Sequence, residues 1–259
     1  MKSRAINKLM KILISGCSFT QWPEYPPNGP NICWPRYLAE SRPDYQITNI
    51  AEPAAGNQYI SDSIIREVMN ERPDHVLVMW SGVSRLDYLT SLEDSAWEQL
   101  FNEYGFYRRV YGARLGWIFS GGKMGTWFKS PTAHTIFNEL YKVSSDTSLA
   151  WINLMEMIKT QNFLKAQGIP YHFMSYVNYW TTESYVSRNG DFGVLGNRVL
   201  EPLVNSIDFD HWIFSDSDRN GLYEMAKAAN DFQSDGFHPG GSSNQKWAEL
   251  IARCMPSAA

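Results

Sequence analysis

Short apolar runs alternate with amphipathic stretches along most of the chain. Apolar runs of strand length are found at residues 11–15, 46–51, 75–80 and 171–177, with 211–214 as a weaker candidate. Apolar residues with helical spacing are found at 34–41, 57–70, 147–167, 221–232 and 242–254. Strands that alternate with helices predict a parallel sheet with helices on both faces. The pattern therefore predicts an α/β protein with three layers, α/β/α, and a parallel sheet of about five strands.

The segment 85–145 interrupts this alternation and is longer than a crossover between two strands needs. Part of it, 105–131, has basic but no acidic residues, with glycines and aromatic residues between them. One interpretation is a solvated insertion that packs on the core or on another subunit, which would give a homo-oligomer or a larger assembly. The other is a cap that shapes a site for an anionic or glycan ligand. In both, residues 1–259 are predicted to form one domain with an insertion at about 85–145.

The composition is that of a globular protein and argues against several other classes. The chain has 259 residues, of which 44% are hydrophobic and 19% charged, and this is enough for one large domain. A net charge of −4 gives no reason to expect nucleic-acid binding. No apolar run reaches the roughly 18 residues of a membrane span. Three cysteines without regular spacing predict a reducing compartment, and we expect a cytoplasmic protein.

One run near the start of the chain imitates a targeting signal. Ile14-Ser15-Gly16-Cys17 resembles a bacterial lipoprotein cleavage box, and basic residues precede it. The apolar stretch before the cysteine is short and is interrupted by Lys11, so a working signal peptide is not expected. Cleavage there would also remove the first predicted strand. We therefore interpret the run as a strand followed by a turn.

Two segments near opposite ends of the chain carry candidate catalytic residues. The first predicted strand runs into Gly16-Cys17-Ser18, which places a hydroxyl at a strand end. The second segment, Asp235-Gly236-Phe237-His238, places a carboxylate three residues before an imidazole. Ligands of parallel α/β sheets bind at the carboxyl ends of the strands, where Ser18 is expected. Together the segments supply a nucleophile, a base and an acid that orients the base.

Four blocks of the sequence, in order, resemble the SGNH (GDSL-type) hydrolases. Gly16-Cys17-Ser18-Phe19-Thr20 matches the nucleophile block, and residues 235–238 match the final Asp-x-x-His block. After the second predicted strand, residues 49–57 contain Gly56 where the family has an oxyanion-hole glycine. The resemblance implies the flavodoxin-like SGNH hydrolase fold. It also implies ester hydrolysis by Ser18, His238 and Asp235, with the backbone amides of Ser18 and Gly56 binding the oxyanion.

The third block departs from the family pattern. The family has Gly-x-Asn after the third strand, and the Asn side chain donates to the oxyanion. This chain has Gly82-Val83-Ser84, so Ser84 stands in the Asn position with a shorter, rotatable donor. Asn57 and Arg85 are the alternative donors. Loss of one such donor costs about 10²–10³ in rate, so the change predicts a slower enzyme rather than an inactive one.

Each candidate residue also has a purely structural interpretation. Ser18 is an ordinary residue type for the cap of a helix or turn after a strand. Asp235 and His238 suit a structural loop pair, and Gly56 suits an ordinary turn. No cofactor and no metal is expected. Four histidines have side chains that could bind a metal but share no metal-ligand spacing: His75, His134, His172 and His211.

Two functions follow from these observations. The first is a serine esterase of SGNH type with a Ser-His-Asp triad, acting on a small ester or on an O-acetyl group of a glycan. The second is an SGNH-like binding or structural protein with little or no activity, part of a larger assembly. Ser84 and the segment 85–145 motivate the second prediction, in which that segment is the contact surface.

Overall fold

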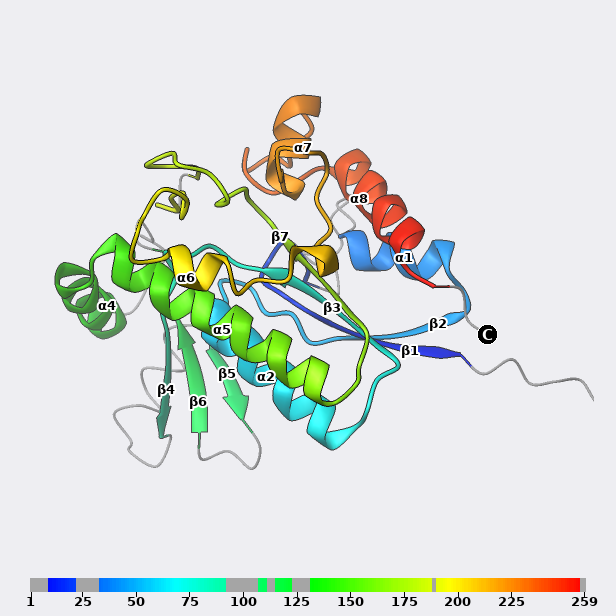
Figure 1. Cartoon of the computed structure of the whole chain (residues 1–259), viewed down its shortest axis with the longest axis horizontal. Coiled ribbons are helices and arrows are strands. Elements are labelled where there is room, and N and C mark those ends of the chain that lie inside the picture. Colours follow the sequence, from blue (N-terminus) through cyan, green and yellow to red (C-terminus); the bar gives the residue numbers. More distant parts are fainter. Residues whose placement is uncertain are drawn as a thin grey trace, which may run out of the picture.

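Four parallel strands form the central sheet of the computed structural model (Figure 1), in the order β2-β1-β3-β7. The structure describes residues 9–21, 33–91, 107–110, 115–122, 131–187 and 190–256. The strands of the central sheet are β1 (Met10–Ser15), β2 (Tyr45–Asn49), β3 (His75–Trp80) and β7 (Tyr171–Ser175). Their bounds differ by at most two residues from those predicted from the apolar runs.

The weaker strand candidate at 211–214 does not form a strand. Phe209–His211 is a short 3-10 helix, η1, and Trp212 makes one isolated parallel bridge to Phe173 of β7. The backbone amide of Ile213 also donates to the carbonyl of Phe173 at 2.8 Å. The chain therefore touches the edge of the sheet there without extending it. The prediction of about five strands is corrected to four in the described part of the sheet.

Helices cover both faces of the central sheet, as the alternating pattern predicts. Figure 1 shows α2 and α5 on one side of the sheet and α1 and α8 on the other. The helices are α1 (Trp34–Ser41), α2 (Asn57–Asn70), α4 (Pro131–Val143), α5 (Asp146–Ala166), α6 (Glu201–Val204), α7 (Leu222–Ala229) and α8 (Gly241–Cys254). The α/β class with a parallel sheet is confirmed.

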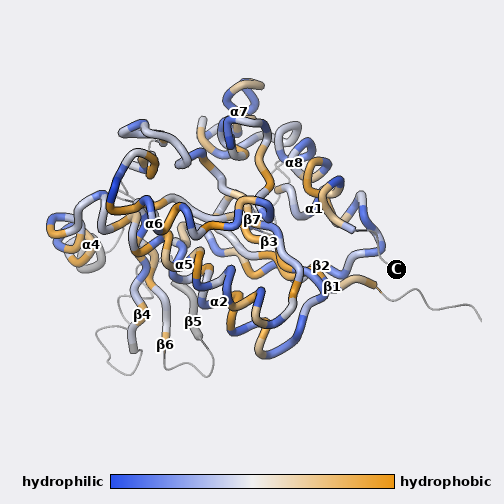
Figure 2. The backbone as a smooth tube through the Cα atoms, viewed as in Figure 1, coloured by the Kyte–Doolittle hydropathy of each residue, from blue (hydrophilic) through white to orange (hydrophobic). Residues whose placement is uncertain are grey.

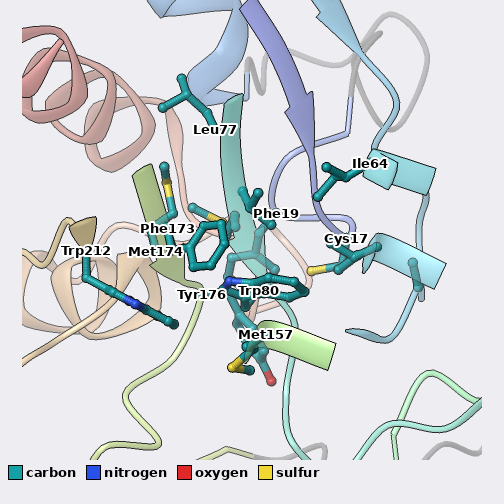
Figure 3. Close-up of a cluster of buried hydrophobic side chains, with 14 of the residues drawn as sticks. Cys17, Phe19, Ile64, Leu77, Trp80, Met157, Phe173, Met174, Tyr176 and Trp212 are labelled. Carbon is teal, nitrogen blue, oxygen red and sulfur yellow. The ribbon is translucent and has the colours of Figure 1, made fainter. Parts of the chain in front are cut away.

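The core lies between the sheet and these helices. All six residues of β3 are buried, since this strand has neighbours on both edges and helices on both faces. Figure 2 shows the hydrophobic residues along the central strands and on the inner sides of the helices. Trp80 at the end of β3 packs edge-on against Phe173 with ring centroids 5.1 Å apart (Figure 3). Large aromatic residues thus fill the end of the sheet that carries the candidate site.

The segment 85–145 forms a second sheet and a helix. Strands β4 (Asp87–Ser91), β5 (Tyr107–Val110) and β6 (Leu115–Phe119) pair antiparallel in the order β4-β6-β5. Most of the basic residues that suggested a cap fall outside the described side chains, so the cap and contact-surface interpretations stay predictions. No helix in the described ranges is long and apolar enough to span a bilayer.

Candidate active site

The candidate nucleophile lies on a tight turn after β1. The backbone amide of Thr20 donates to the carbonyl of Cys17 at 2.9 Å, which closes the turn around Ser18. Gly16 is required by close approach, because a Cβ there would lie 2.5 Å from Thr20 Oγ1. Cys17 and Phe19 on either side of Ser18 are buried, so the turn is anchored in the core. Ser18 is thereby held at the carboxyl end of β1, where the sequence places it.

The candidate base lies in a loop that the aspartate organises. Asp235 Oδ1 accepts hydrogen bonds from the backbone amides of Phe237, at 2.8 Å, and His238, at 2.9 Å. Gly236 has a φ of 65°, a left-handed conformation that glycine adopts at low cost. These bonds use one carboxylate oxygen to fold the loop. The other oxygen, Oδ2, is left to face the imidazole.

The structure brings Ser18, His238 and Asp235 together although Ser18 and His238 are 220 residues apart. His238 Nε2 lies 2.8 Å from Ser18 Oγ, and His238 Nδ1 lies 2.5 Å from Asp235 Oδ2. Partial burial alone would raise the pKa of Asp235. However, hydrogen bonds from the His238 side chain and from the amides of Phe237 and His238 outweigh it and hold that pKa well below its usual range. An ionised carboxylate can only accept, so Nδ1 carries a proton, and in the neutral imidazole Nε2 accepts from the serine hydroxyl.

Aromatic rings hold the imidazole in this orientation. The His238 ring packs on Phe19, with centroids 5.1 Å apart, and on Phe237, with centroids 5.4 Å apart. Phe19 in turn contacts Tyr176, with centroids 4.6 Å apart, and Figure 3 shows both rings in the buried cluster with Cys17. Contacts on two sides restrict rotation of the imidazole. The base is therefore positioned by packing as well as by its carboxylate partner.

The Gly56 amide, the second predicted oxyanion donor, is engaged within the protein. Gly56 is the N-cap residue of α2, and its backbone amide donates to Asp87 Oδ1 at 2.9 Å. Asp87 Oδ2 accepts from the backbone amide of Tyr59 at 3.0 Å. A Cβ at position 56 would lie 2.8 Å from both carboxylate oxygens, so only glycine fits against Asp87. A remote carboxylate thus caps this helix.

The alternative oxyanion donors, Asn57, Ser84 and Arg85, also have partners inside the protein. The Asn57 side chain accepts from the backbone amide of Ser81 at 2.8 Å and donates to the carbonyl of Ser81 at 3.2 Å. Arg85 Nη1 donates to the carbonyl of Ala55 at 2.9 Å. Ser84 Oγ donates to Asp191 Oδ1 at 2.8 Å. Two of the predicted oxyanion donors have no acceptor in the described structure: the backbone amide of Ser18 and Nε of Arg85.

Asp191, which sequence reasoning missed, organises the third block. It is fully buried, and it accepts hydrogen bonds from Ser84 Oγ, Tyr176 Oη and Ser187 Oγ. A Cβ on Gly82 would collide with this carboxylate at 1.8 Å. Asp191 therefore occupies the space beside the Gly82-Val83-Ser84 turn. No motif marks it in the sequence, because its partners come from three separate segments.

Two titratable groups near this turn, Asp87 and Arg85, are buried. Burial raises the pKa of Asp87 to about 7, although the amides of Tyr59 and Gly56 and the charge of Arg85 oppose the rise. Burial alone would lower the pKa of Arg85, but the nearby acidic groups Cys17, Tyr176, Asp191 and Asp87 raise it. The guanidinium therefore stays charged. Its Nε has no hydrogen-bond partner in the described part of the chain.

Three of the four candidate metal-ligating histidines, His75, His172 and His211, lie together at the amino ends of β3 and β7. His75 begins β3 at the amino end of the sheet, and its Nε2 lies 3.0 Å from Nδ1 of His172 on β7. His211 stacks on Tyr171, with ring centroids 4.5 Å apart. The side chain of His134 falls outside the described part. Within the described ranges, no group of three or more His, Cys, Asp or Glu residues is arranged to hold a metal ion.

Comparison with known proteins adds structural neighbours at low identity. No family model and no curated protein matches this chain. A member of the lipolytic protein G-D-S-L family from Veillonella parvula is 13% identical, with a TM-score of 0.45 over 94% of this chain and 97% of that chain. An acetylxylan esterase from Geobacillus stearothermophilus, solved as a catalytic mutant, is 14% identical, with a TM-score of 0.46 over 96% of this chain and 94% of that chain.

A Bacillus subtilis protein is 11% identical with a TM-score of 0.47, and the match covers 95% of this chain but only 55% of that protein. The neighbours across the whole chain include SGNH (GDSL-type) esterases, as the sequence blocks suggest. The strand order and the helical layers, rather than these scores, define the fold.

Proposed function

We propose that this chain is a serine ester hydrolase of SGNH type, with Ser18 as nucleophile, His238 as general base and Asp235 as the orienting carboxylate. One observation carries the proposal: Ser18 Oγ, the two nitrogens of His238 and Asp235 Oδ2 form a continuous hydrogen-bonded series of 2.8 and 2.5 Å. This is the arrangement that an activated serine requires. The proposed substrate is a small carboxylic ester, with an O-acetyl group on a glycan as one form of it.

The geometry supports a two-step reaction. Ser18 Oγ attacks the ester carbonyl carbon while His238 Nε2 takes its proton, and Asp235 stabilises the resulting imidazolium. The tetrahedral intermediate collapses to an acyl-serine, and His238 returns the proton to the departing alcohol. Water, deprotonated by His238, then releases the acid and restores Ser18. The Ser18 backbone amide supplies one donor to the oxyanion.

The test is covalent labelling with a fluorophosphonate, which reacts with an activated serine. We expect labelling of the wild type at Ser18, and loss of labelling together with a fall of at least about 10³-fold in hydrolysis of p-nitrophenyl acetate in Ser18→Ala. Ser15→Ala is the matched control, because Ser15 Oγ faces Ser63 Oγ in the core at 3.3 Å. Unchanged hydrolysis in Ser18→Ala would refute the assignment.

A second candidate function is an SGNH-like binding or structural protein with little activity. This second function is favoured because the other predicted oxyanion donors make hydrogen bonds inside the protein. Gly56 donates to Asp87 and Asn57 to Ser81, while Ser84 donates to Asp191 and Arg85 to Ala55. An oxyanion bound by a single amide would form slowly. The same probe separates the two functions, since a wild-type protein that is folded and not labelled would support the second.

A further inference from the structure

Asp87 is a buried carboxylate that the proposed reaction does not use. It is 8% exposed and is the first residue of β4, in the insertion. Besides accepting from Gly56 and Tyr59, it donates its own backbone amide to Gln58 Oε1 at 2.9 Å. These three bonds fasten the first strand of the insertion to the first turn of α2. We call this set of bonds the Asp87 clasp.

The insertion sheet fixes the position of the Asp87 clasp. Asp87 pairs with Phe119 of β6, and the preceding Leu86 donates its backbone amide to Ser120 Oγ at 2.9 Å. Tyr141 of α4 reaches the same Ser120 Oγ at 2.6 Å. A movement of the insertion sheet or of α4 would therefore move Asp87 relative to the Gly56 loop. The insertion sheet and the Gly56 amide are therefore linked through Asp87.

The Gly56 amide has a single proton, and the clasp uses it. At 2.9 Å the amide points at Asp87 Oδ1, so it does not point at a substrate oxygen in this arrangement. The other charged or titratable groups that act on Asp87 are Arg85, Glu156 and Tyr141.

We propose that Asp87 is a positioning residue that sets the availability of the Gly56 amide. While the clasp is closed, the amide is held by the carboxylate and hydrolysis is slow. When β4 and the insertion sheet shift, Asp87 withdraws and the amide becomes the second oxyanion donor. The inference rests on the proposed ester hydrolysis, and it gives the insertion a role in controlling that reaction.

The test compares two variants that cut the clasp at different points. Asp87→Ala removes the acceptor of the Gly56 amide, whereas Gln58→Ala removes the acceptor of the Asp87 amide and leaves Gly56 engaged. We expect Asp87→Ala to raise kcat for p-nitrophenyl acetate, and the rate of fluorophosphonate labelling, by about tenfold or more. KM should change by less than about twofold, because an oxyanion donor acts on the transition state. Gln58→Ala weakens the clasp but leaves the acceptor of the Gly56 amide in place, so it should raise both rates by less than Asp87→Ala does.

A purely structural role for Asp87 predicts a different result, with lower activity in Asp87→Ala and a similar loss in Gln58→Ala. If circular dichroism shows that Asp87→Ala is unfolded, the same kinetic measurements are made on Asp87→Asn. The single side-chain oxygen of Asn cannot accept from the amides of both Gly56 and Tyr59 as the carboxylate does. A folded variant with unchanged or lower kcat, beside a labelled wild type, overturns this inference alone. If neither the wild type nor any folded variant is labelled, the proposed hydrolysis itself fails.

Discussion

The two halves of the candidate site are built in different ways. In the nucleophile half, Ser18, His238 and Asp235 come from two short motifs, and each side chain faces the next. In the oxyanion half, Gly56 and Ser84 come from motif positions too, but their donors face Asp87 and Asp191. The difference shows that a motif fixes the residue type and the local backbone. Contacts from other segments decide whether the donor is available.

The largest expected effect concerns the nucleophile half. Asp235→Asn would place an amide nitrogen or oxygen against His238 Nδ1 and favour the wrong tautomer, so we expect kcat to fall by about 10³–10⁴-fold. Asp216→Asn is the matched control. Asp216 Oδ1 likewise accepts backbone amides, from Asp218 at 3.0 Å and Asn220 at 3.3 Å, but faces no histidine in the described structure. Equal kcat values for the two variants would remove Asp235 from the mechanism.

The next effect concerns stability in the oxyanion half. Asp191→Ala leaves the buried hydroxyls of Ser84 and Tyr176 without their acceptor, so we expect the free energy of unfolding to fall by about 3 kcal/mol or more. Ser187→Ala, which removes one donor, should cost about 1 kcal/mol. Urea unfolding measures both. A loss below about 1 kcal/mol in Asp191→Ala would show that the buried carboxylate does not hold this turn together.

The smallest expected effect is that Asp87 in the oxyanion half and Asp235 in the nucleophile half make the stability of the protein depend on pH in opposite directions. Asp87 has a folded-state pKa of about 7 against an ordinary 3.8, so its contribution to stability is present below about pH 4 and is lost as pH rises toward 7. Asp235, whose pKa lies below its usual range, contributes above its ordinary pKa and loses that contribution as pH falls.

Urea unfolding of the wild type and of Asp87→Asn between pH 4 and pH 8 tests the first half of this contrast. We expect the wild type to lose stability relative to the variant as pH rises through this interval. If the difference in free energy of unfolding between the wild type and Asp87→Asn stays constant with pH, the raised pKa of Asp87 is contradicted. For the wild type and Asp235→Asn, we expect the opposite dependence at acid pH: the wild type should lose free energy of unfolding relative to the variant as pH falls.

The sequence predicted the central fold better than the site. The apolar runs at β1, β2, β3 and β7 were recognisable because each is short, buried and followed by a helix. Trp212 misled the strand prediction, since its apolar neighbours pack beside β7 through one bridge only. The antiparallel sheet of the insertion was not predicted, because the apolar residues of its short strands follow no clear alternation.

Within the site, local spacing was enough to place His238 beside Asp235, since three residues separate them in one loop. Asp87 and Asp191 could not be found in this way. Asp87 accepts hydrogen bonds from Tyr59 and Gly56, which lie 28 and 31 positions earlier in the sequence. Asp191 accepts one from Ser84, 107 positions earlier. Such pairings depend on the packing of the insertion and of the loop before α6, which no local pattern encodes.

The separation of Ser18 from His238 also has a consequence for biosynthesis. Residues near Ser18 leave the ribosome early, whereas the loop of His238 and the helix α8, which packs on α1, leave late. A nascent chain with β1 already made would carry Ser18 without its proposed base, so the proposed hydrolysis could not yet begin. In the proposed mechanism, activity would arise only after the His238 loop and α8 have docked, so hydrolysis would report completed folding.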